Sequence, residues 1–236
     1  MAGARSAGRM PFMSASPLNR RSAALYGAEL TQPGYQQRIA ESHKNSLALA
    51  LWSAGDLAVN ERNPAEVDRL ASEIIELSTR HNFPHWLALG DFYRGCACSA
   101  SDDAARAIPW IEHGIREYRA TGTVLGMPAL LAYKAEALHL ADRTSEALEV
   151  VNEAEALAER FEQRYWCADL HRLRGVFLAA TGADETQIEA SLCAAIRIAK
   201  EQKSVSQEKR AEATYAEYRR QKADESEGRG FRLPLW

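Results

Sequence analysis

A small residue recurs every 40 positions through the middle of this chain of 236 residues, at Gly55, Gly95, Ala135 and Gly175. Each of these four marker residues lies midway along a segment whose apolar residues follow a helical period. A short polar break comes after each segment, and a second helical pattern follows the break. A fixed period of this length indicates a repeat protein whose unit is a helix, a turn and a second helix.

Two of the repeats are related by residue identity as well as by period. The segments 85–100 and 165–180 lie 80 positions apart and share residues at five equivalent places. These pairs are Trp86/Trp166, Ala88/Ala168, Arg94/Arg174, Gly95/Gly175 and Ala100/Ala180. Two unrelated amphipathic helices would seldom align both a tryptophan and a glycine, so the agreement supports an internal repeat.

The second helix of each unit carries one apolar stripe. In the first unit the stripe steps by three, four and three residues, through Val67, Leu70, Ile74 and Leu77. This is the period of a helix with one buried face, and no strand pattern of period two competes with it. The 42 alanines agree, because alanine has the highest helix propensity and is small enough for close helix packing.

A single helix pair cannot bury its own stripe, so neighbouring pairs must stack. The sequence therefore predicts an all-α, right-handed solenoid of four antiparallel helix pairs over about residues 43–204, with a capping helix over roughly 206–222. We expect a disordered arm over 1–35, a helical repeat domain over 36–222 and a tail over 223–236. The arginine-rich, acid-poor arm shares its composition with transit peptides, but disorder is the favoured interpretation. The apolar end of the tail, 231–236, is able to pack back onto the last helices.

Proline and capping residues agree with this division. Pro64, Pro84 and Pro128 fall where helices are expected to begin, and a missing N–H costs nothing there. The expected N-caps are Asp102, Thr144 and Asp184. Pro109 falls inside a helical pattern, so we expect it to kink that helix or to shift its start.

Composition and spacing exclude several functional classes. A net charge of −3 and a pI near 6.1 argue against a dedicated nucleic-acid binder. No apolar stretch approaches the roughly 20 residues that span a bilayer. The cysteines lack zinc-ligand spacing and are expected to be small buried residues in a reducing cytoplasm: Cys96, Cys98, Cys167 and Cys193. Of the six histidines, only His81 and His85 lie four residues apart, and the expected helix start at Pro84 separates them. We expect no metal, no cofactor and no catalytic residue.

The repeat resembles the tetratricopeptide type, in which a small residue of the first helix packs near an alanine of the second, here Ala107 or Ala147. Its period of 40 exceeds that family's 34, and little of the aromatic consensus is present. The longer variant resembles the tetratricopeptide-like C-terminal region of bacterial class III adenylate/guanylate cyclases and their predicted-ATPase relatives, over residues 43–236. The segments that carry this resemblance are NFPHWLA at 82–88, YRATG at 118–122, LHRLRG at 170–175, AEYRRQK at 216–222 and GFRLPL at 230–235.

The catalytic parts of those relatives have no counterpart here. The chain has neither a Gly-x-x-x-x-Gly-Lys-Ser/Thr loop nor paired aspartates on a strand pattern. The resemblance therefore implies a regulatory or scaffold arm without the enzyme.

A cation stands one residue before each of the last three markers, at Arg94, Lys134 and Arg174. Equivalent positions line up in a stacked array, so this cation ladder would attract an acidic peptide, a C-terminal carboxylate or a phosphate. The alternative is that the three side chains are solvated or form ordinary surface ion pairs. The ladder is the predicted partner-binding site.

Three functions stay open at this stage. The first is a non-enzymatic interaction module that binds a protein or peptide on a concave face. The second is an effector sensor with a ligand in an aromatic groove, and the third is a separated C-terminal arm of a cyclase. A wholly apolar, closed groove would favour the sensor, and an open groove with the cation ladder would favour the interaction module. The aromatic side chains are expected to be core rather than a ligand cage: Trp52, Trp86, Phe92, Tyr93, Trp110, Tyr133, Trp166 and Phe177.

Overall fold

The computed structural model describes residues 35–100 and 104–225, which form nine α-helices, one 3₁₀ turn and no strand. The predicted all-α class is confirmed. The elements are α2 (Tyr35–Asn60), α3 (Pro64–His81), α4 (Pro84–Ala100), α5 (Ala104–Ala120), α6 (Met127–Leu140), α7 (Thr144–Arg160), η1 (Arg164–Trp166), α8 (Cys167–Ala180), α9 (Glu185–Glu201) and α10 (Val205–Glu225). The predicted arm, the tail segment 231–236 and the predicted cap Asp102 lie outside the described residues, apart from Tyr35.

The chain divides into two compact units between Leu47 and Ala48. The first unit holds the beginning of α2, where the Ser46 hydroxyl donates to the Ser42 carbonyl at 2.9 Å. All of the packing described below belongs to the second unit. The domain boundaries expected from the sequence, at 35/36 and 222/223, stay predictions.

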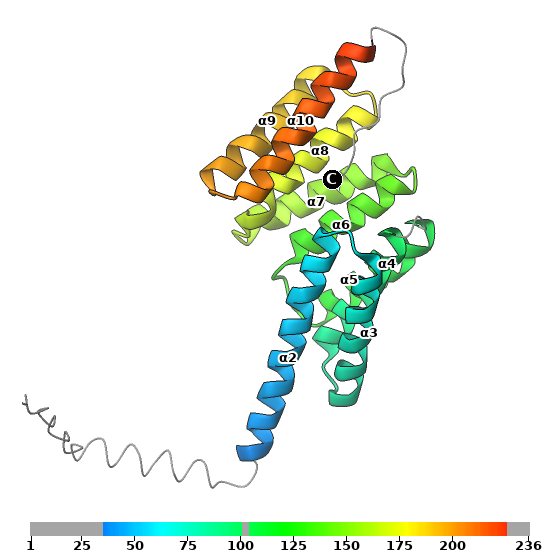
Figure 1. The fold of residues 1–236 in the computed structure, drawn as a ribbon, viewed down its shortest axis with the longest axis vertical. Coiled ribbons are helices and arrows are strands. Elements are labelled where there is room, and N and C mark those ends of the chain that lie inside the picture. Colours follow the sequence, from blue (N-terminus) through cyan, green and yellow to red (C-terminus); the bar gives the residue numbers. More distant parts are fainter. Residues whose placement is uncertain (1–34, 101–103, 226–236) are drawn as a thin grey trace, which may run out of the picture. The chain divides into compact units, whose positions relative to one another are not determined.

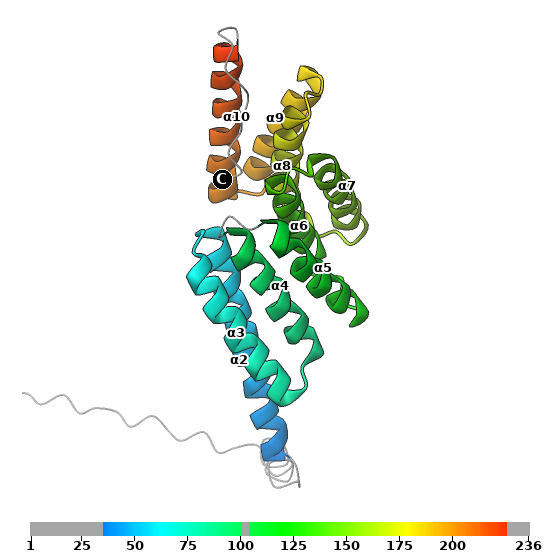
Figure 2. The same ribbon diagram turned by 90° about the vertical axis from the view of Figure 1, so that its right-hand side faces the viewer.

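Helices of the second unit pack in chain order, as the repeat predicts (Figures 1 and 2). The pairs α4–α5, α6–α7 and α8–α9 each form one repeat, and α10 packs on both α8 and α9. The first helices of successive repeats, α4, α6 and α8, also contact one another. The capping helix is thus where the sequence places it.

The marker residues lie where helices cross closely. A Cβ atom added at Gly95 would lie 2.6 Å from Cγ1 and 2.8 Å from the backbone nitrogen of Ile111 on α5. A Cβ atom added at Gly175 would lie 2.6 Å from Cδ2 of Leu192 on α9. Ala135 is fully buried. The predicted reason for the small residues, close approach of the first helix to the second, is confirmed for Gly95 and Gly175. At Gly55 the close neighbour is instead the Tyr93 ring on α4, the first helix of the next repeat.

The turns recur every 20 residues, which is half the 40-residue period of the helix pairs. The backbone is left-handed at positions 62, 82, 122, 142, 162 and 182, which step by 20 wherever the intervening turn is described. Gly122 and Gly182 occupy two of these places, with φ of 78° and 70°. Glycine adopts this conformation without the steric cost that a side chain brings.

Most of the predicted helix starts are confirmed. Pro64 and Pro84 are the first residues of α3 and α4, and Pro128 is the second residue of α6. Asp184 caps α9, because its carboxylate accepts from the Thr186 N–H at 2.8 Å.

The expected cap at Thr144 is wrong, and so is one of the two effects expected of Pro109, a shifted helix start; the kink stays a prediction. Thr144 is the first residue of α7 rather than its cap, and its hydroxyl lies 2.9 Å from Nδ1 of His139 instead. Pro109 does not shift the start of α5, which begins at Ala104 and runs through the proline. Pro109 and Ala105 are both exposed, so the carbonyl that loses its helical partner faces water.

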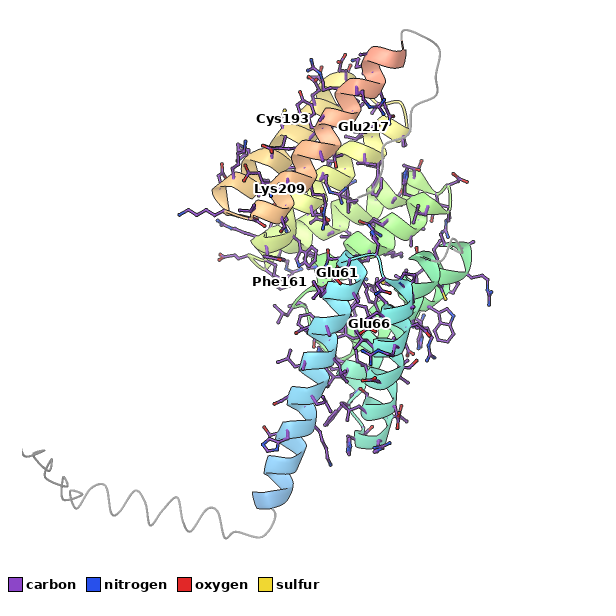
Figure 3. All side chains as sticks on the ribbon, in the orientation of Figure 1. Glu61, Glu66, Phe161, Cys193, Lys209 and Glu217 are labelled. Atoms are coloured by element: carbon purple, nitrogen blue, oxygen red, sulfur yellow. The ribbon has the colours of Figure 1, made fainter. Side chains whose placement is uncertain are left out.

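The cysteine prediction is confirmed for Cys96, which is buried, and is wrong for Cys193, which is exposed on α9 (Figure 3). The buried side of α9 runs through Ile188, Leu192 and Ala195, and Cys193 faces away from it. An apolar neighbourhood in the sequence does not decide which side of a helix a residue takes.

Candidate functional site

A groove of about 810 Å³ lies along the second half of α2, α4, the start of α6 and the turn before α8. We call it the aromatic groove. Its volume falls within the range of ligand sites, about 300–1,000 Å³. It is lined by Leu49, Trp52, Asp56, His85, Trp86, Leu89, Tyr93, Tyr118, Thr123, Leu125, Gly126, Ala129, Leu130, Phe161, Glu162, Gln163, Arg164, Tyr165 and Trp166.

Aromatic rings from four separate elements form its walls. The Trp52 and Trp86 rings lie 6.4 Å apart between centroids, and His85 packs edge-on against Trp86 at 4.8 Å. On the η1 side, Tyr165 and Trp166 meet edge to face at 5.3 Å. Trp86 and Trp166 stand at equivalent places in their repeats, so the internal repeat brings tryptophans to both walls.

The rim includes large apolar side chains in contact with water. Leu125 is 73% exposed and Tyr165 is 66% exposed. Phe161 lies beside them in the turn that follows α7 and is also exposed (Figure 3). Several exposed apolar side chains on the rim of one groove are typical of a binding site.

Side-chain amides hold the turns that form the rim. The Gln163 side chain accepts from the Gly126 N–H at 2.7 Å and donates to the Val124 carbonyl at 2.9 Å. The Gln202 amide donates to the Arg164 carbonyl at 2.5 Å. The turns before α6 and α8 are therefore fixed to each other and to the end of α9, which preorganises the groove.

Asp56 contributes a carboxylate to the groove wall. It lies one helical turn after Trp52, and its Oδ1 accepts from the Tyr133 hydroxyl at 3.1 Å. Burial raises the pKa of Asp56 above its ordinary value, and the hydrogen bond from Tyr133 opposes this only in part. Burial also lowers the pKa of His85, which favours the neutral imidazole in the same groove.

A buried ion network lies next to the groove on α6 and α8. The Arg172 side chain is 1% exposed, and its Nε donates to Asp169 at 2.7 Å. Glu136 accepts from Arg62 at 2.9 Å and lies 3.8 Å from Arg172. Arg210 of α10 reaches Asp169 at 3.6 Å, so the network joins the first repeat to the capping helix.

The network shifts the pKa values of its two acids in opposite directions. Burial alone would raise the pKa of Asp169, but the charge and hydrogen bond of Arg172, together with the charges of Arg210 and Arg62, outweigh burial, so its pKa is lowered. Burial raises the pKa of Glu136, and the charges of Arg62 and Arg172 offset this only in part. No group of three or more His, Cys, Asp or Glu in the part of the chain that the structure describes is placed to hold a metal ion.

The predicted cation ladder lies elsewhere. Lys134 pairs with Glu112 of α5 at 2.9 Å, and Arg174 pairs with Glu155 of α7. The Arg94 guanidinium lies 5.9 Å from the centroid of the Trp110 ring on α5. All three cations contact second helices, and none lines the aromatic groove. Their use by a partner stays a prediction.

The aromatic prediction is confirmed only for part of its set. Phe92, Tyr93 and Phe177 are fully buried core residues, whereas Trp110 is 42% exposed. Trp52, Trp86 and five further aromatic side chains line the groove, namely Tyr93, Tyr118, Phe161, Tyr165 and Trp166. Sequence reasoning also missed Asp56, although a signal for it existed. Asp56 directly follows the first marker, at the position that Glu136 takes in the third repeat.

None of the described helices is both long enough and apolar enough to cross a membrane. No family model matches the chain. It is 27% identical over 194 residues to the uncharacterized protein R02095 of Rhizobium meliloti (strain 1021). The alignment covers 82% of this chain but 19% of that protein, so the chain spans about a fifth of its relative.

The fold is similar to that in the crystal structure of Bacillus thuringiensis PlcR in complex with the peptide PapR7 and DNA. The TM-score is 0.57 at 13% identity, over 77% of this chain and 76% of PlcR. At this identity the likeness concerns the fold alone. Together with the helix pairing, it confirms a tetratricopeptide-like helical solenoid.

Proposed function

We propose that this chain is a non-enzymatic regulatory module that binds a short peptide or protein segment in the aromatic groove. The observation that carries the proposal is the groove itself, with its preformed rim and its aromatic walls. Tyrosine and tryptophan side chains supply much of the binding energy at protein interfaces, because they bury large areas at low entropic cost. The solved complex of PlcR with a peptide supports a peptide ligand for this related fold.

A small-molecule effector is the alternative occupant of the same groove. The groove is neither wholly apolar, as expected for an effector sensor, nor lined by the cation ladder, as expected for the interaction module. Asp56, His85 and Gln163 make it polar in places, so it is not wholly apolar. The exposed rim residues Leu125 and Tyr165 favour the larger ligand, because a small molecule bound among the walls would leave them in water.

Selection from a phage-displayed library of random heptapeptides tests the proposal. The purified chain should enrich peptides, and a selected peptide should bind roughly tenfold more weakly to the Leu125→Ala/Tyr165→Ala double variant. Trp110→Ala is the matched control, because Trp110 is an exposed aromatic residue outside the groove. Selected peptides that bind the double variant and the wild type equally would refute the groove as the site. A failure to enrich any peptide would refute a peptide ligand.

The cation ladder is proposed as a second contact for an acidic partner. Such a partner has to replace the existing pairs of Lys134 with Glu112 and of Arg174 with Glu155. Its test is a pull-down with Arg94, Lys134 and Arg174 all changed to Glu. The matched control changes three exposed arginines outside the ladder, Arg69, Arg80 and Arg219. Identical partners for both triple variants would dismiss the ladder.

We further propose a cytoplasmic module that regulates cyclase or ATPase signalling, and we expect neither nucleic acid nor lipid as its partner. The relative, which is more than four times as long, supports a module joined to other domains in some proteins. Affinity purification from the cells that produce the chain, followed by mass spectrometry, is the test. Retention of a cyclase or ATPase domain is the expected result. Retention of other partners alone would contradict the link.

A further inference from the structure

We infer that the aromatic groove recognises a cationic group of its ligand, an ammonium or a guanidinium, which pairs with the Asp56 carboxylate beside the rings of Trp52 and Trp86. The inference rests on the proposed function and adds the chemistry of the ligand. The carboxylate concerned, Asp56, is separate from the predicted cation ladder.

Asp56 differs from Glu136 and Asp169, two carboxylates that the fold withdraws from water and pairs with arginine. Glu136 has Arg62 at 2.9 Å, and Asp169 has Arg172 at 2.7 Å. Among the residues that the structure describes, Asp56 pairs with no cation, and the Tyr133 hydroxyl is the group that donates to it. A partly buried carboxylate without a counter-charge is costly, and such groups are normally paired. Asp56 also lines the groove, so a ligand can supply the missing charge.

The aromatic rings that line the groove with Asp56 also favour a positively charged ligand group. Trp52 and Asp56 are four residues apart on α2 and therefore lie on one helix face. The Trp86 ring lies 6.4 Å from that of Trp52, and the Tyr93 hydroxyl donates to the Trp52 carbonyl at 3.3 Å, which fixes the two helices here. The face of an indole ring attracts a cation, and aromatic walls around a carboxylate form a site for an organic ammonium or guanidinium.

The remaining charged groups of the groove do not supply the counter-charge. Glu162 and Arg164 lie in the turn before α8 and are exposed, so solvent screens them. The neutral imidazole of His85 adds no positive charge. A ligand carboxylate or phosphate placed at this end would meet Asp56 directly. The groove and the cation ladder thus prefer ligand groups of opposite charge.

The first test uses three probes of similar size: phenethylammonium, its neutral N-acetyl derivative, and 3-phenylpropionate. Binding is followed by intrinsic fluorescence, because Trp52, Trp86 and Trp166 line the groove. Phenethylammonium should bind at least roughly tenfold more tightly than either other probe. Equal binding of the three probes, or no binding of the ammonium, would overturn the inference. This comparison uses the wild-type chain and does not depend on how a variant folds.

The second test uses Asp56→Asn, which keeps an acceptor for Tyr133 but removes the charge. Ammonium binding should weaken roughly tenfold, while binding of the neutral probe should not change. Asp68→Asn is the matched control, because Asp68 is exposed on α3 outside the groove, and it should bind as the wild type does. An ammonium affinity that Asp56→Asn leaves unchanged would overturn the inference.

The source of the cation is found with a peptide selected from the heptapeptide library. One version has an acetylated amino terminus, and another has each lysine or arginine replaced by norleucine. The version that loses affinity identifies the amino terminus or the side chain as the cation. Unchanged affinity in both would overturn the inference while leaving the groove as a peptide site. If the peptide binds outside the groove, the Leu125→Ala/Tyr165→Ala variant will bind it as tightly as the wild type does. That result would refute the groove as the peptide site, so it is distinguishable from a failure of the cation inference alone.

Discussion

Gly114 provides a sharp test of how closely the helices pack. It lies on α5 where that helix crosses α4, and a Cβ atom there would lie 2.7 Å from the Phe92 nitrogen and 2.8 Å from the Ala88 carbonyl oxygen. Both atoms belong to the backbone of α4, so no side chain can rotate away. The Gly114→Ala substitution therefore has to move the two helices apart.

The size of the effect follows from two opposing contributions. Replacing a helical glycine by alanine stabilises the helix by about 1 kcal/mol. Restoring ordinary contact at 3.4 Å needs a shift of roughly 0.6–0.7 Å between the helices, and a gap of this size loses about a quarter to a half of each dispersion contact around it. Overpacking of this kind costs typically 1–3 kcal/mol. We expect the overpacking to outweigh the propensity, with a net loss of up to about 2 kcal/mol.

Urea denaturation followed by far-UV circular dichroism measures this loss. Ala156→Gly, at an exposed position in the middle of α7, gives the propensity contribution in the same chain. Gly55→Ala should cost less, because its new Cβ would meet ring atoms of Tyr93 rather than a backbone. A Gly114→Ala protein that is more stable than the wild type by the propensity difference would refute the close backbone contact.

Three further predictions concern the ion network, a cap and the groove carboxylate. Arg172→Met leaves Asp169 and Glu136 buried without their shared cation, so it should lower the free energy of unfolding by about 3–5 kcal/mol in urea titrations. Asn63→Ala removes the acceptor for the Glu66 N–H and should cost about 1 kcal/mol in the same assay. Asp56 has a raised pKa in the folded chain, so it lowers stability as the pH rises from the ordinary pKa of aspartate through the raised one. The gain in melting temperature from Asp56→Asn should therefore be absent below this window and complete above it, and a gain that does not change with pH would contradict the assignment.

The fold could be predicted from the sequence because its signals are local and repeated. Four small residues at one period, with prolines at helix starts, determine helix positions without any long-range information. The failures are also local in origin. Thr144 is a residue type that often caps helices, but its hydroxyl interacts with the His139 ring instead. Cys193 sits among apolar residues, yet it faces outward on α9.

The site could be predicted only in part, since a repeat pattern identifies equivalent positions without showing which surface they reach. The cations one residue before the markers point toward second helices, where Glu112 and Glu155 pair with two of them. Asp56, one residue after the first marker, lies on the groove side instead. Two positions along a helix correspond to a rotation of roughly 200°, so the residues just before and just after a marker lie on nearly opposite helix faces. The repeat was therefore identified correctly, but the cations before the markers lie on the face away from the groove.

The groove residues Trp86 and Trp166 show the same limit. Their shared place in the repeat was correctly identified, and large aromatic residues are more often core than cage. Whether a ring is covered depends on the next element in space, here the turn 161–166 held by Gln163. That contact joins residues 37 positions apart and has no signature in a local pattern.

A crystal structure of the chain with a peptide selected from the heptapeptide library tests the central claim most directly. The account predicts peptide density in the aromatic groove, between α2, α4, α6 and the turn 161–166, with an ammonium or guanidinium nitrogen roughly 3 Å from a carboxylate oxygen of Asp56. A peptide bound along the outer face of the second helices, with the groove empty, would contradict it.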